Sequence, residues 1–326
     1  ATLNLLDTNS ELAGKKLDTV LHVNDGDKKP VKFSQQLRRA RGVQTRDDLR
    51  STISGETIRL SVVYSPIRSA NSTQASTNDG YIVILRDITK QKSLEEERDE
   101  FISVVSHELR TPITIAEGSL SNVQLMMKRP EIPQTTLQNG VDLAHDQILF
   151  LAKMVNDLST LSRAERGIAD APEIIKVSEM INELYAEYAP QAHAKSLGFD
   201  LDLDPKLGTV NESPLYLKEL LQNFVTNAIK YTQKGNVAVS VKRAGDKLTF
   251  AVKDSGIGIS RSDQQHLYQK FWRSEDYRTR ETGGTGLGLY VSQKLARKLN
   301  TTIELKSRLN HGSTFSFTIP TAPPDK

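Results

Sequence analysis

Cysteine is absent from all 326 residues of the chain. Disulfides and thiolate metal sites are therefore excluded, and this composition fits a reducing compartment. No run of 18 or more apolar residues occurs either, so the sequence predicts no membrane-spanning helix within it. Neither sign of charge dominates, because 43 Lys and Arg residues stand against 40 Asp and Glu residues. This balance gives no reason to expect a nucleic-acid partner.

The length of the chain suits two or three domains, each large enough to bury its own core. The sequence opens on Ala1 rather than on a methionine, and its first residues resemble the interior of a domain. We therefore expect a cytoplasmic fragment of a longer protein. A membrane anchor upstream of the fragment is an open alternative.

Residues 1–90 have the pattern of a small α+β domain, with mixed helical and irregular signals first and strands last. A half-buried strand is predicted where apolar residues alternate with polar ones at Ile58, Leu60, Val62 and Tyr64. A loop rich in Ser, Asn and Thr then leads from Arg68 to Gly80 into a second strand at residues 81–85. The two strands should form a long antiparallel hairpin.

Residues 91–165 are predicted to form a helical linker and an antiparallel helical hairpin, turned between Pro130 and Pro133. The second helix, to about Ser162, carries apolar residues at alternating steps of three and four: Val141, Ala144, Ile148, Leu151, Val155 and Leu158. One hairpin buries such a face poorly, so we expect a homodimeric four-helix bundle. The alternative is that the hairpin packs on its own neighbouring domain.

The first helix of this hairpin contains His107, with Glu108 beside it and Thr111 one turn further on. One apolar stripe runs along the helix at three- and four-residue steps, through Ile102, Val105, Leu109, Pro112, Ala116, Leu120 and Val123. His107 should point away from this stripe, and an exposed imidazole next to a carboxylate is a candidate nucleophile and base. Taken alone, the pair is more simply a surface histidine in a charged helix.

A polar linker from Arg163 to about Pro172 should lead into an α/β domain at residues 172–320, followed by a disordered tail at 321–326. A strand hairpin turned at residues 244–246 is predicted by apolar alternation at Val237, Val239, Val241, Leu248, Phe250 and Val252. Residues 315–319 should form a last strand.

A helix should begin at Ser213 and Pro214, an N-cap and first-turn pair, and run to about Lys230. One of its sides is apolar, and the opposite side carries Glu219, Asn223, Asn227 and Lys230 at steps of four, four and three. Amide and carboxylate oxygens suit Mg²⁺, and an ammonium suits a phosphate. The plainer interpretation is a solvated helix face.

Asp254 continues the alternation of the second hairpin strand, so its side chain should point inward like the apolar ones before it. A carboxylate at such a position needs a hydrogen-bond partner that is held in place. The amino group of a purine would serve. Gly256 and Gly258 follow directly, at positions where a backbone turns sharply or lies against a ligand. A second glycine-rich loop at residues 283–289 opens a helix whose first amides can face phosphates. Together, the amide-bearing helix and the two loops predict a nucleotide site.

These segments closely resemble the motifs of the sensor histidine kinases of two-component systems, over residues 91–320. Ser106–Pro112 (Ser-His-Glu-Leu-Arg-Thr-Pro) resembles the H box, and residues 223–232 (Asn-Phe-Val-Thr-Asn-Ala-Ile-Lys-Tyr-Thr) resemble the N box. Asp254-Ser-Gly-Ile-Gly-Ile and Gly284-Thr-Gly-Leu-Gly-Leu resemble the two G boxes, and Lys270-Phe-Trp-Arg resembles the F box. More loosely, residues 1–90 resemble a PAS domain without its opening strand.

The resemblance implies a multidomain fold: an α+β PAS-like domain, a dimeric HisKA-type helical hairpin, and an α/β-sandwich ATP-binding domain of the Bergerat (GHKL) type. In the last, a mixed sheet lies beneath three helices and a mobile lid spans about 260–285. ATP and Mg²⁺ are the implied cofactors. Asn223 and Asn227 would hold Mg²⁺, with Glu219 a weaker candidate. The implied nucleotide contacts are Lys230 and Arg273 to phosphates, Tyr231 and Asp254 to adenine, and the loop residues Gly256, Gly258, Thr285, Gly286, Leu287 and Gly288.

The implied reaction is phosphorylation of His107, with Glu108 accepting the other imidazole proton, and then transfer to an aspartate of a response-regulator receiver domain. Thr111 either positions a water for dephosphorylation of that regulator or merely precedes Pro112. The alternatives are a GHKL-type ATPase and a scaffold that binds ATP without catalysis. We interpret the remaining histidines as structural and expect no transition-metal site: His22, His145, His193, His266 and His311.

Overall fold

The computed structural model describes residues 12–53, 55–67, 80–129, 132–167, 171–280 and 283–322. Contacts divide the chain into two compact units, Ala1–His107 and Glu108–Lys326. Within the described residues, no helix is long and apolar enough to cross a membrane.

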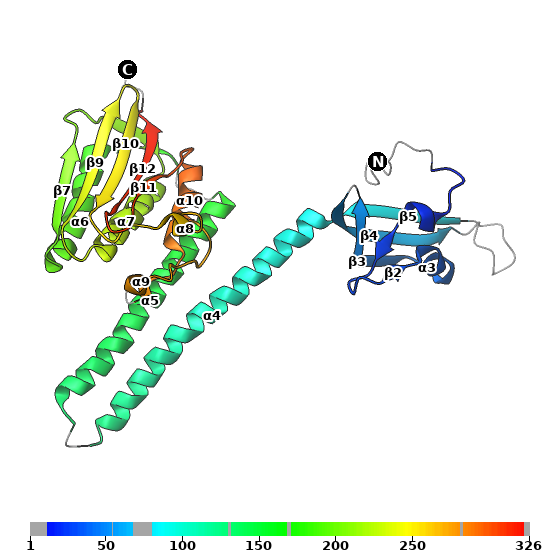
Figure 1. The fold of residues 1–326 in the computed structure, drawn as a ribbon, viewed down its shortest axis with the longest axis horizontal. Helices are drawn as coiled ribbons and strands as arrows, with labels where there is room; N and C mark the ends of the chain where they lie inside the picture. Colours follow the sequence, from blue (N-terminus) through cyan, green and yellow to red (C-terminus); the bar gives the residue numbers. More distant parts are fainter. Residues whose placement is uncertain are drawn as a thin grey trace. The chain divides into compact units, whose positions relative to one another are not determined.

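The first unit is built on one antiparallel sheet of five strands in the order β2-β1-β3-β4-β5 (Figure 1). Its elements are α2 (Leu17–Val20), β1 (Val23–Asn24), β2 (Pro30–Val31), α3 (Phe33–Arg39), β3 (Gln44–Ile53), β4 (Glu56–Ile67) and β5 (Gly80–Asp87). The predicted hairpin is confirmed, because β4 pairs with β5 from Leu60–Asp87 to Ile67–Gly80. The predicted loop before Gly80 lies outside the described residues at 68–79.

Strand β3 was not predicted, because its sequence is mostly polar and only Leu49 and Ser51 are buried in it. Its register also shifts between Arg46 and Leu49, which interrupts the alternation that normally reveals a strand. The hydrophobic pattern therefore predicts two strands where the sheet has five.

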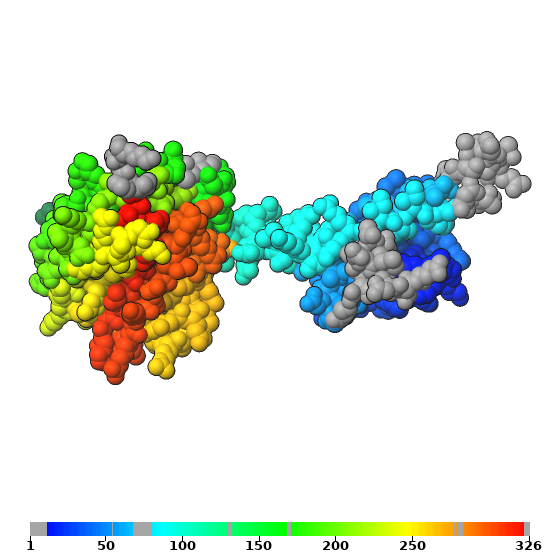
Figure 2. Space-filling model, turned by 90° about the horizontal axis from the view of Figure 1, so that it is seen from above, coloured from blue at the N-terminus to red at the C-terminus, as the bar shows by residue number. Residues whose placement is uncertain are grey.

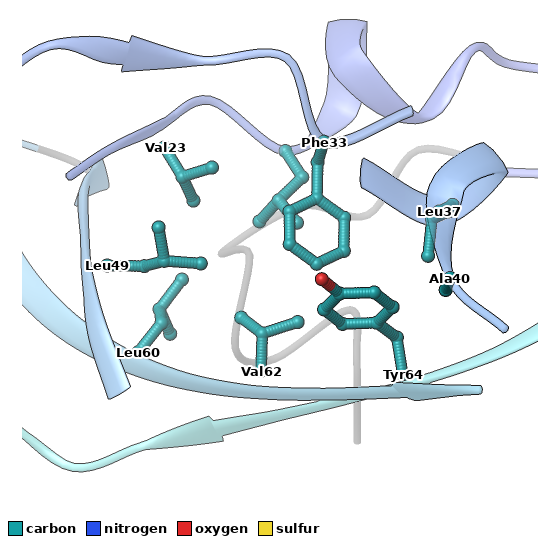
Figure 3. Close-up of a cluster of buried hydrophobic side chains, with 9 residues drawn as sticks. Val23, Phe33, Leu37, Ala40, Leu49, Leu60, Val62 and Tyr64 are labelled. Atoms are coloured by element: carbon teal, nitrogen blue, oxygen red, sulfur yellow. The ribbon is translucent and has the colours of Figure 1, made fainter. Parts of the chain in front are cut away.

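The core of the first unit lies between α3 and the sheet (Figure 3). Phe33 is fully buried and meets Tyr64 of β4 edge to face, with ring centroids 5.1 Å apart. The buried cluster consists of Leu21, Val23, Phe33, Leu37, Ala40, Leu49, Leu60, Val62 and Tyr64. The predicted alternation in β4 is thus confirmed, since Leu60, Val62 and Tyr64 all face this core.

The sheet of the first unit is joined to the start of helix α4 (Thr89–Met126) by several hydrogen bonds. The Thr89 backbone N–H and hydroxyl both donate to Asp87 Oδ1, at 2.8 and 2.6 Å. Arg59 of β4 donates to both carboxylate oxygens of Glu96, at 2.5 and 2.9 Å, in a bidentate ion pair. The first two turns of α4 are therefore tied to the sheet.

Helices α4 and α5 (Gln134–Arg166) confirm the predicted helical linker and antiparallel hairpin (Figure 1). The two helices approach closely where Gly140 lies against Val123, since a Cβ on Gly140 would be 2.5 Å from Val123 Cγ2. Helix α5 runs four residues beyond the predicted Ser162, and Gly167 ends it with the left-handed φ of 67° typical of a C-cap. Many apolar side chains of the pair remain exposed: Leu94, Ile102, Ile113, Ile115, Leu120, Leu125, Val141, Leu143, Ile148, Leu149 and Val155.

The C-terminal part of the second unit is a two-layer α/β sandwich. Its mixed sheet has the order β11-β12-β10-β9-β7, in which only β7 and β9 pair in parallel. Helices α6, α7 and α10 pack on one face of it (Figure 1). The bounds are β6 Glu173–Lys176, α6 Val177–Ala194, β7 Gly198–Leu203, β8 Thr209–Glu212, α7 Pro214–Tyr231, β9 Asn236–Ala244, β10 Lys247–Asp254, α10 Gly288–Lys298, β11 Glu304–Ser307 and β12 Ser313–Pro320.

The core of this sandwich follows from strict alternation in the strands. Phe250 of β10 stacks on Phe317 of β12 at 5.0 Å, and Phe224 of α7 stacks on Phe315 at 5.2 Å. The predicted hairpin is confirmed, because Ala244 pairs with Lys247 across the turn. The predicted tail begins too early, since Thr321 and Ala322 still donate backbone hydrogen bonds to Asp246 and Thr209. Residues 323–326 lie outside the described residues.

The segment predicted to be a lid contains two four-residue helices, α8 (Arg261–Gln264) and α9 (Tyr277–Arg280). From α8 to α9, coloured gold to orange, it lies at the surface of the second unit (Figure 2). Residues 281–282 lie outside the described part of the chain. The mobility of the segment stays a prediction.

Candidate functional site

Helix α7 positions one wall of the site. Ser213 is its N-cap, with the hydroxyl accepting a hydrogen bond from the Tyr216 N–H, and Pro214 opens the first turn as predicted. The predicted apolar side is buried against the sheet. However, Asn223 on the other side is also buried, at 7% exposure, and its Nδ2 has no hydrogen-bond partner among the described residues. An ordinary solvated helix face does not contain an unsatisfied buried amide.

A cavity of about 260 Å³ lies beside α7 in the second unit. It brings together ten of the residues predicted from sequence, which are Asn223, Asn227, Lys230, Tyr231, Asp254, Gly258, Arg273, Thr285, Gly286 and Gly288. Three of the residues predicted for the nucleotide and metal site do not line it. Glu219 lies near Asp157 of α5, Gly256 donates its N–H to Asp254, and the Leu287 N–H donates to the Thr285 hydroxyl at 3.2 Å. The Leu287 amide is therefore already engaged within its own loop.

Asp254 ends β10 at the cavity and is only 8% exposed. Burial raises the pKa of its carboxyl group, while hydrogen bonds from the Gly256 and Ser313 backbones oppose that shift. The fixed partner predicted for this carboxylate is thus partly its own loop, since Gly256 N donates to Oδ1 at 2.8 Å. Close by, the buried Thr232 hydroxyl has no partner within the described residues, so the environment of Asp254 still contains an unused polar group.

The second glycine-rich loop packs directly against α7. A Cβ on Gly284 would be 2.5 Å from Lys230 Nζ, and a Cβ on Gly288 would be 3.2 Å from Asn223 Oδ1. Any side chain at these glycines would displace the polar groups of α7. The close approach explains why two motifs far apart in the sequence form one wall.

Gly286 and Gly258 need glycine for a second reason, which is their left-handed backbone. Gly286 has φ of 68°, and a Cβ there would be 2.6 Å from the Phe271 carbonyl carbon. Gly258 has φ of 63° and lies against the Arg308 carbonyl oxygen. Both positions combine a φ that other residues rarely adopt with backbone contact, so the two loops have little freedom to accept a side chain.

Positive charge converges on the cavity. Burial, together with the charges of Arg273, Lys153 and Lys195, lowers the pKa of Lys230 to about 8. Its Nζ lies 4.7 Å from the centroid of the Tyr231 ring. An anion bound beside these cations would raise the pKa of Lys230 again, so the lowered pKa of Lys230 favours the binding of an anion. The electrostatics suit a polyanion such as a row of phosphates.

His107 lies on α4 with its side chain exposed, as predicted. On the opposite stripe Pro112, Ala116 and Val123 are buried, but Ile102 and Leu120 remain 54% and 41% exposed. Glu108 is half-buried and Thr111 is exposed. The stripe is therefore only partly covered within one chain.

Comparison with known families assigns the helix that carries His107 and helix α7 to two different domains. Residues 97–167 match HisKA, the His Kinase A (phospho-acceptor) domain, and residues 212–323 match HATPase_c, the histidine kinase-, DNA gyrase B-, and HSP90-like ATPases. The chain is 30% identical over 254 residues to the sensor histidine kinase WalK of Bacillus subtilis. This chain belongs to the sensor histidine kinases of two-component systems.

The alignment with that sensor histidine kinase covers 74% of this chain but only 40% of the Bacillus protein. Among solved structures, the histidine kinase AdeS of Acinetobacter baumannii is 25% identical, with a TM-score of 0.52 over 67% of this chain and 98% of that one. Histidine kinase ThkA, solved in complex with response regulator protein TrrA, gives 0.54 at 20% identity over 90% and 83% of the two chains. The second likeness concerns the fold alone.

The residues of this sensor histidine kinase fit the nucleotide that its HATPase_c domain implies. The amide oxygen of Asn223, a residue that lines the cavity, suits a hard cation such as Mg²⁺, and its Nδ2, which lacks a partner among the described residues, can donate to a phosphate oxygen. Lys230, Arg273 and the glycine-rich loop supply positive charge and backbone amides for phosphates. No group of three or more His, Cys, Asp and Glu side chains that could hold a metal ion occurs among the described residues.

Sequence reasoning missed the part of the cavity wall that lies outside the kinase motifs. Helix α5 of the HisKA domain contributes Phe150 and Lys153, and the lid segment contributes Asp263, Ser274 and Asp276. No spacing singles out the α5 pair, because Phe150 and Lys153 flank the apolar seam of the hairpin. Only the fold brings this helix to the nucleotide cavity.

Proposed function

We propose that this chain is the ATP-dependent protein-histidine kinase portion of a two-component sensor, which phosphorylates itself on His107. The observation that supports this most directly is one chain with an exposed histidine on a HisKA helix and a cationic, glycine-lined cavity in an HATPase_c domain. Phosphoryl transfer gives a role to both parts. A phosphate-binding cavity supplies the donor, and an imidazole outside any metal site supplies the acceptor.

The residues that line the cavity suggest the following roles. Asp254 would accept a hydrogen bond from the adenine amino group, with Tyr231 flanking the ring. Lys230 and Arg273 would contact phosphates, as would backbone amides of the Thr285–Gly288 loop other than that of Leu287. Asn223 and Asn227 would bind Mg²⁺, which supplies charge neutralisation on the phosphates when it is bound. Glu219 receives no support as a metal ligand from its position.

In the reaction, Nε2 of neutral His107 attacks the γ-phosphorus of ATP, so an N–P bond forms as the bond to the β-bridging oxygen breaks and ADP leaves. Glu108 takes the proton from Nδ1, which prevents a positive charge from building up on the imidazole. Positioning and charge neutralisation should supply most of the acceleration, through Lys230 and the phosphate-facing loop.

The two competing functions differ in what happens to the γ-phosphate. A GHKL-type ATPase would release it to water, and an ATP-binding scaffold would leave ATP intact. The HisKA match over residues 97–167 favours the kinase over both.

The proposed partner is the receiver domain of a response regulator. We expect γ-labelled ATP to label the chain first and then, on addition of a panel of receiver domains, to pass its label to an aspartate in one of them. Release of free phosphate without any protein label would instead indicate an ATPase. In the same assay, Thr111→Ala should slow the decay of the phosphorylated receiver if Thr111 positions a water, and should leave the labelling of His107 intact.

The helical hairpin is proposed to form a homodimer. Exposed apolar side chains recur along both helices, including Ile148 and Val155 of the predicted seam at 52% and 58% exposure. A second copy of the hairpin would cover them in a four-helix bundle.

The first unit is proposed to be a PAS-like regulatory domain that acts through α4. Replacing Arg59 by Gln removes the bidentate ion pair with Glu96 and should change the autophosphorylation rate by about twofold or more, while ATP affinity stays the same. Arg98→Gln is the matched control, since Arg98 pairs with its neighbour Asp99 on the same helix. Equal rates for both variants would argue against this route of regulation.

A further inference from the structure

The nucleotide cavity has a wall that belongs to the phosphoacceptor hairpin rather than to the ATP-binding domain. Phe150 and Lys153 of α5 line it together with Asn227 and Lys230 of α7. On the same side of α5, Met154 is fully buried and Asp157 is 5% exposed, because α5 packs against α10 there. This part of α5 is therefore docked on the ATP-binding domain.

Lys153 brings a positive charge to the part of the cavity where Lys230 lies. The charge of Lys153 contributes to the lowered pKa of Lys230, so the two ammonium groups act on each other. Lys153 itself is exposed, so its long side chain can follow a ligand. Two lysines from different helices, beside a loop of backbone amides, form the kind of cluster that binds a chain of phosphates.

A buried hydrogen bond fixes α5 to that loop. The Thr285 hydroxyl donates to Asp157 Oδ2 at 2.9 Å and also accepts from the Leu287 N–H at 3.2 Å. Thr285 is 3% exposed, and burial raises the pKa of the Asp157 carboxyl group, partly offset by Lys153 and by the bond to Thr285. Since Asp157 lies one helical turn after Lys153, the bond that holds the loop also sets where Lys153 stands.

We propose that Lys153 is a phosphate-contacting residue of the ATP site, and that the Asp157–Thr285 hydrogen bond is the positioning contact that holds it there. The nucleotide is then bound between α5 and the ATP-binding domain. This rests on the proposed kinase function and extends its site to the helix that follows the phosphoacceptor helix. By linkage, bound ATP favours the docked arrangement of α5 to the same extent that docking favours ATP.

The test measures the affinity of the full chain for Mg·ATP and for adenosine, which has no phosphates. Lys153→Ala should weaken ATP binding about tenfold and leave adenosine binding unchanged, and Lys153→Arg should bind ATP within about twofold of the parent. Arg163→Ala is the matched control, since it removes one positive charge from α5 away from the cavity lining. A loss no larger than that of Arg163→Ala, or an equal loss for adenosine, overturns the proposal.

The positioning contact is tested with a double-mutant cycle. In an Asp157→Ala background, Lys153→Ala should change ATP affinity by less than about twofold. In an Asp157→Asn background the effect of Lys153→Ala should return, since the amide oxygen of the new side chain still accepts from Thr285 without a charge. A full effect of Lys153→Ala in both backgrounds contradicts the positioning role of Asp157.

The proposed function and this inference fail differently. If Lys230→Ala weakens ATP binding and Lys153→Ala does not, the kinase site stands and the extension to α5 is wrong. If the parent chain binds no ATP at all, the proposed function fails and this inference fails with it.

Discussion

Replacing His107 with Gln is expected to abolish the acid-labile, alkali-stable label that the chain acquires from γ-labelled ATP. Glutamine keeps a polar side chain on an exposed helical position, but its amide nitrogen is not a nucleophile. The affinity for ATP should not change, because His107 is absent from the cavity lining. Autoradiography after acid and alkali treatment measures the label, and equilibrium binding measures the affinity.

His145→Gln is the matched control, because His145 is also an exposed histidine on a hairpin helix. It should label like the parent, and label surviving in His107→Gln would place the phosphoacceptor elsewhere. Mixing His107→Gln chains with Asn227→Ala chains extends the test to the proposed dimer. Label on the mixture means transfer between chains, and light scattering under the same conditions shows whether an unlabelled mixture is dimeric.

Gly286→Ala is expected to weaken ATP binding on the order of 100-fold. Alanine at a φ of 68° is strained, and its Cβ would be 2.6 to 2.8 Å from backbone atoms of Phe271. The loop must therefore move away from the position in which it closes the cavity beside Lys230. Calorimetric titration with Mg·ATP gives the affinity of the variant.

Gly283→Ala provides the comparison, because a Cβ at Gly283 meets no atom within 4 Å. It should bind ATP within about twofold of the parent. A thermal melt of each variant without nucleotide separates loss of the site from loss of the fold. If Gly286→Ala and Gly283→Ala bind ATP equally well, the tight contact with Phe271 does not shape the site.

Much of the ATP-binding domain could be predicted because its signals are local. Ser213 and Pro214 mark the start of α7, and alternation in β9 and β10 marks a hairpin that buries every second residue. Asn223 and Gly288 are 65 positions apart in sequence, and the combination of motifs assigned them to one nucleotide site without predicting that they lie in contact. Side-chain periodicity gives the face of an element, whereas the partner of that face depends on the tertiary fold.

The first unit was harder to predict for a physical reason. Its strand β3 buries few side chains and changes register midway, so the hydrophobic pattern that marks β4 is missing from it. The ends of elements were also misplaced where a single backbone hydrogen bond determines the last residue of the fold, as at Thr321. The contribution of Lys153 to the cavity could not be predicted, since it depends on how α5 docks.

The periodicity of helix α4 relates the ion pair between Arg59 and Glu96 to the position of His107. Glu96 and His107 are separated by about three full turns of α4, and Thr89 and His107 by about five, so all three project from nearly the same azimuth of the helix. The sheet is therefore bonded to the same side of α4 from which His107 projects. A rotation of α4 about its axis at the Arg59–Glu96 ion pair turns His107, about 16 Å further along that axis, through the same angle.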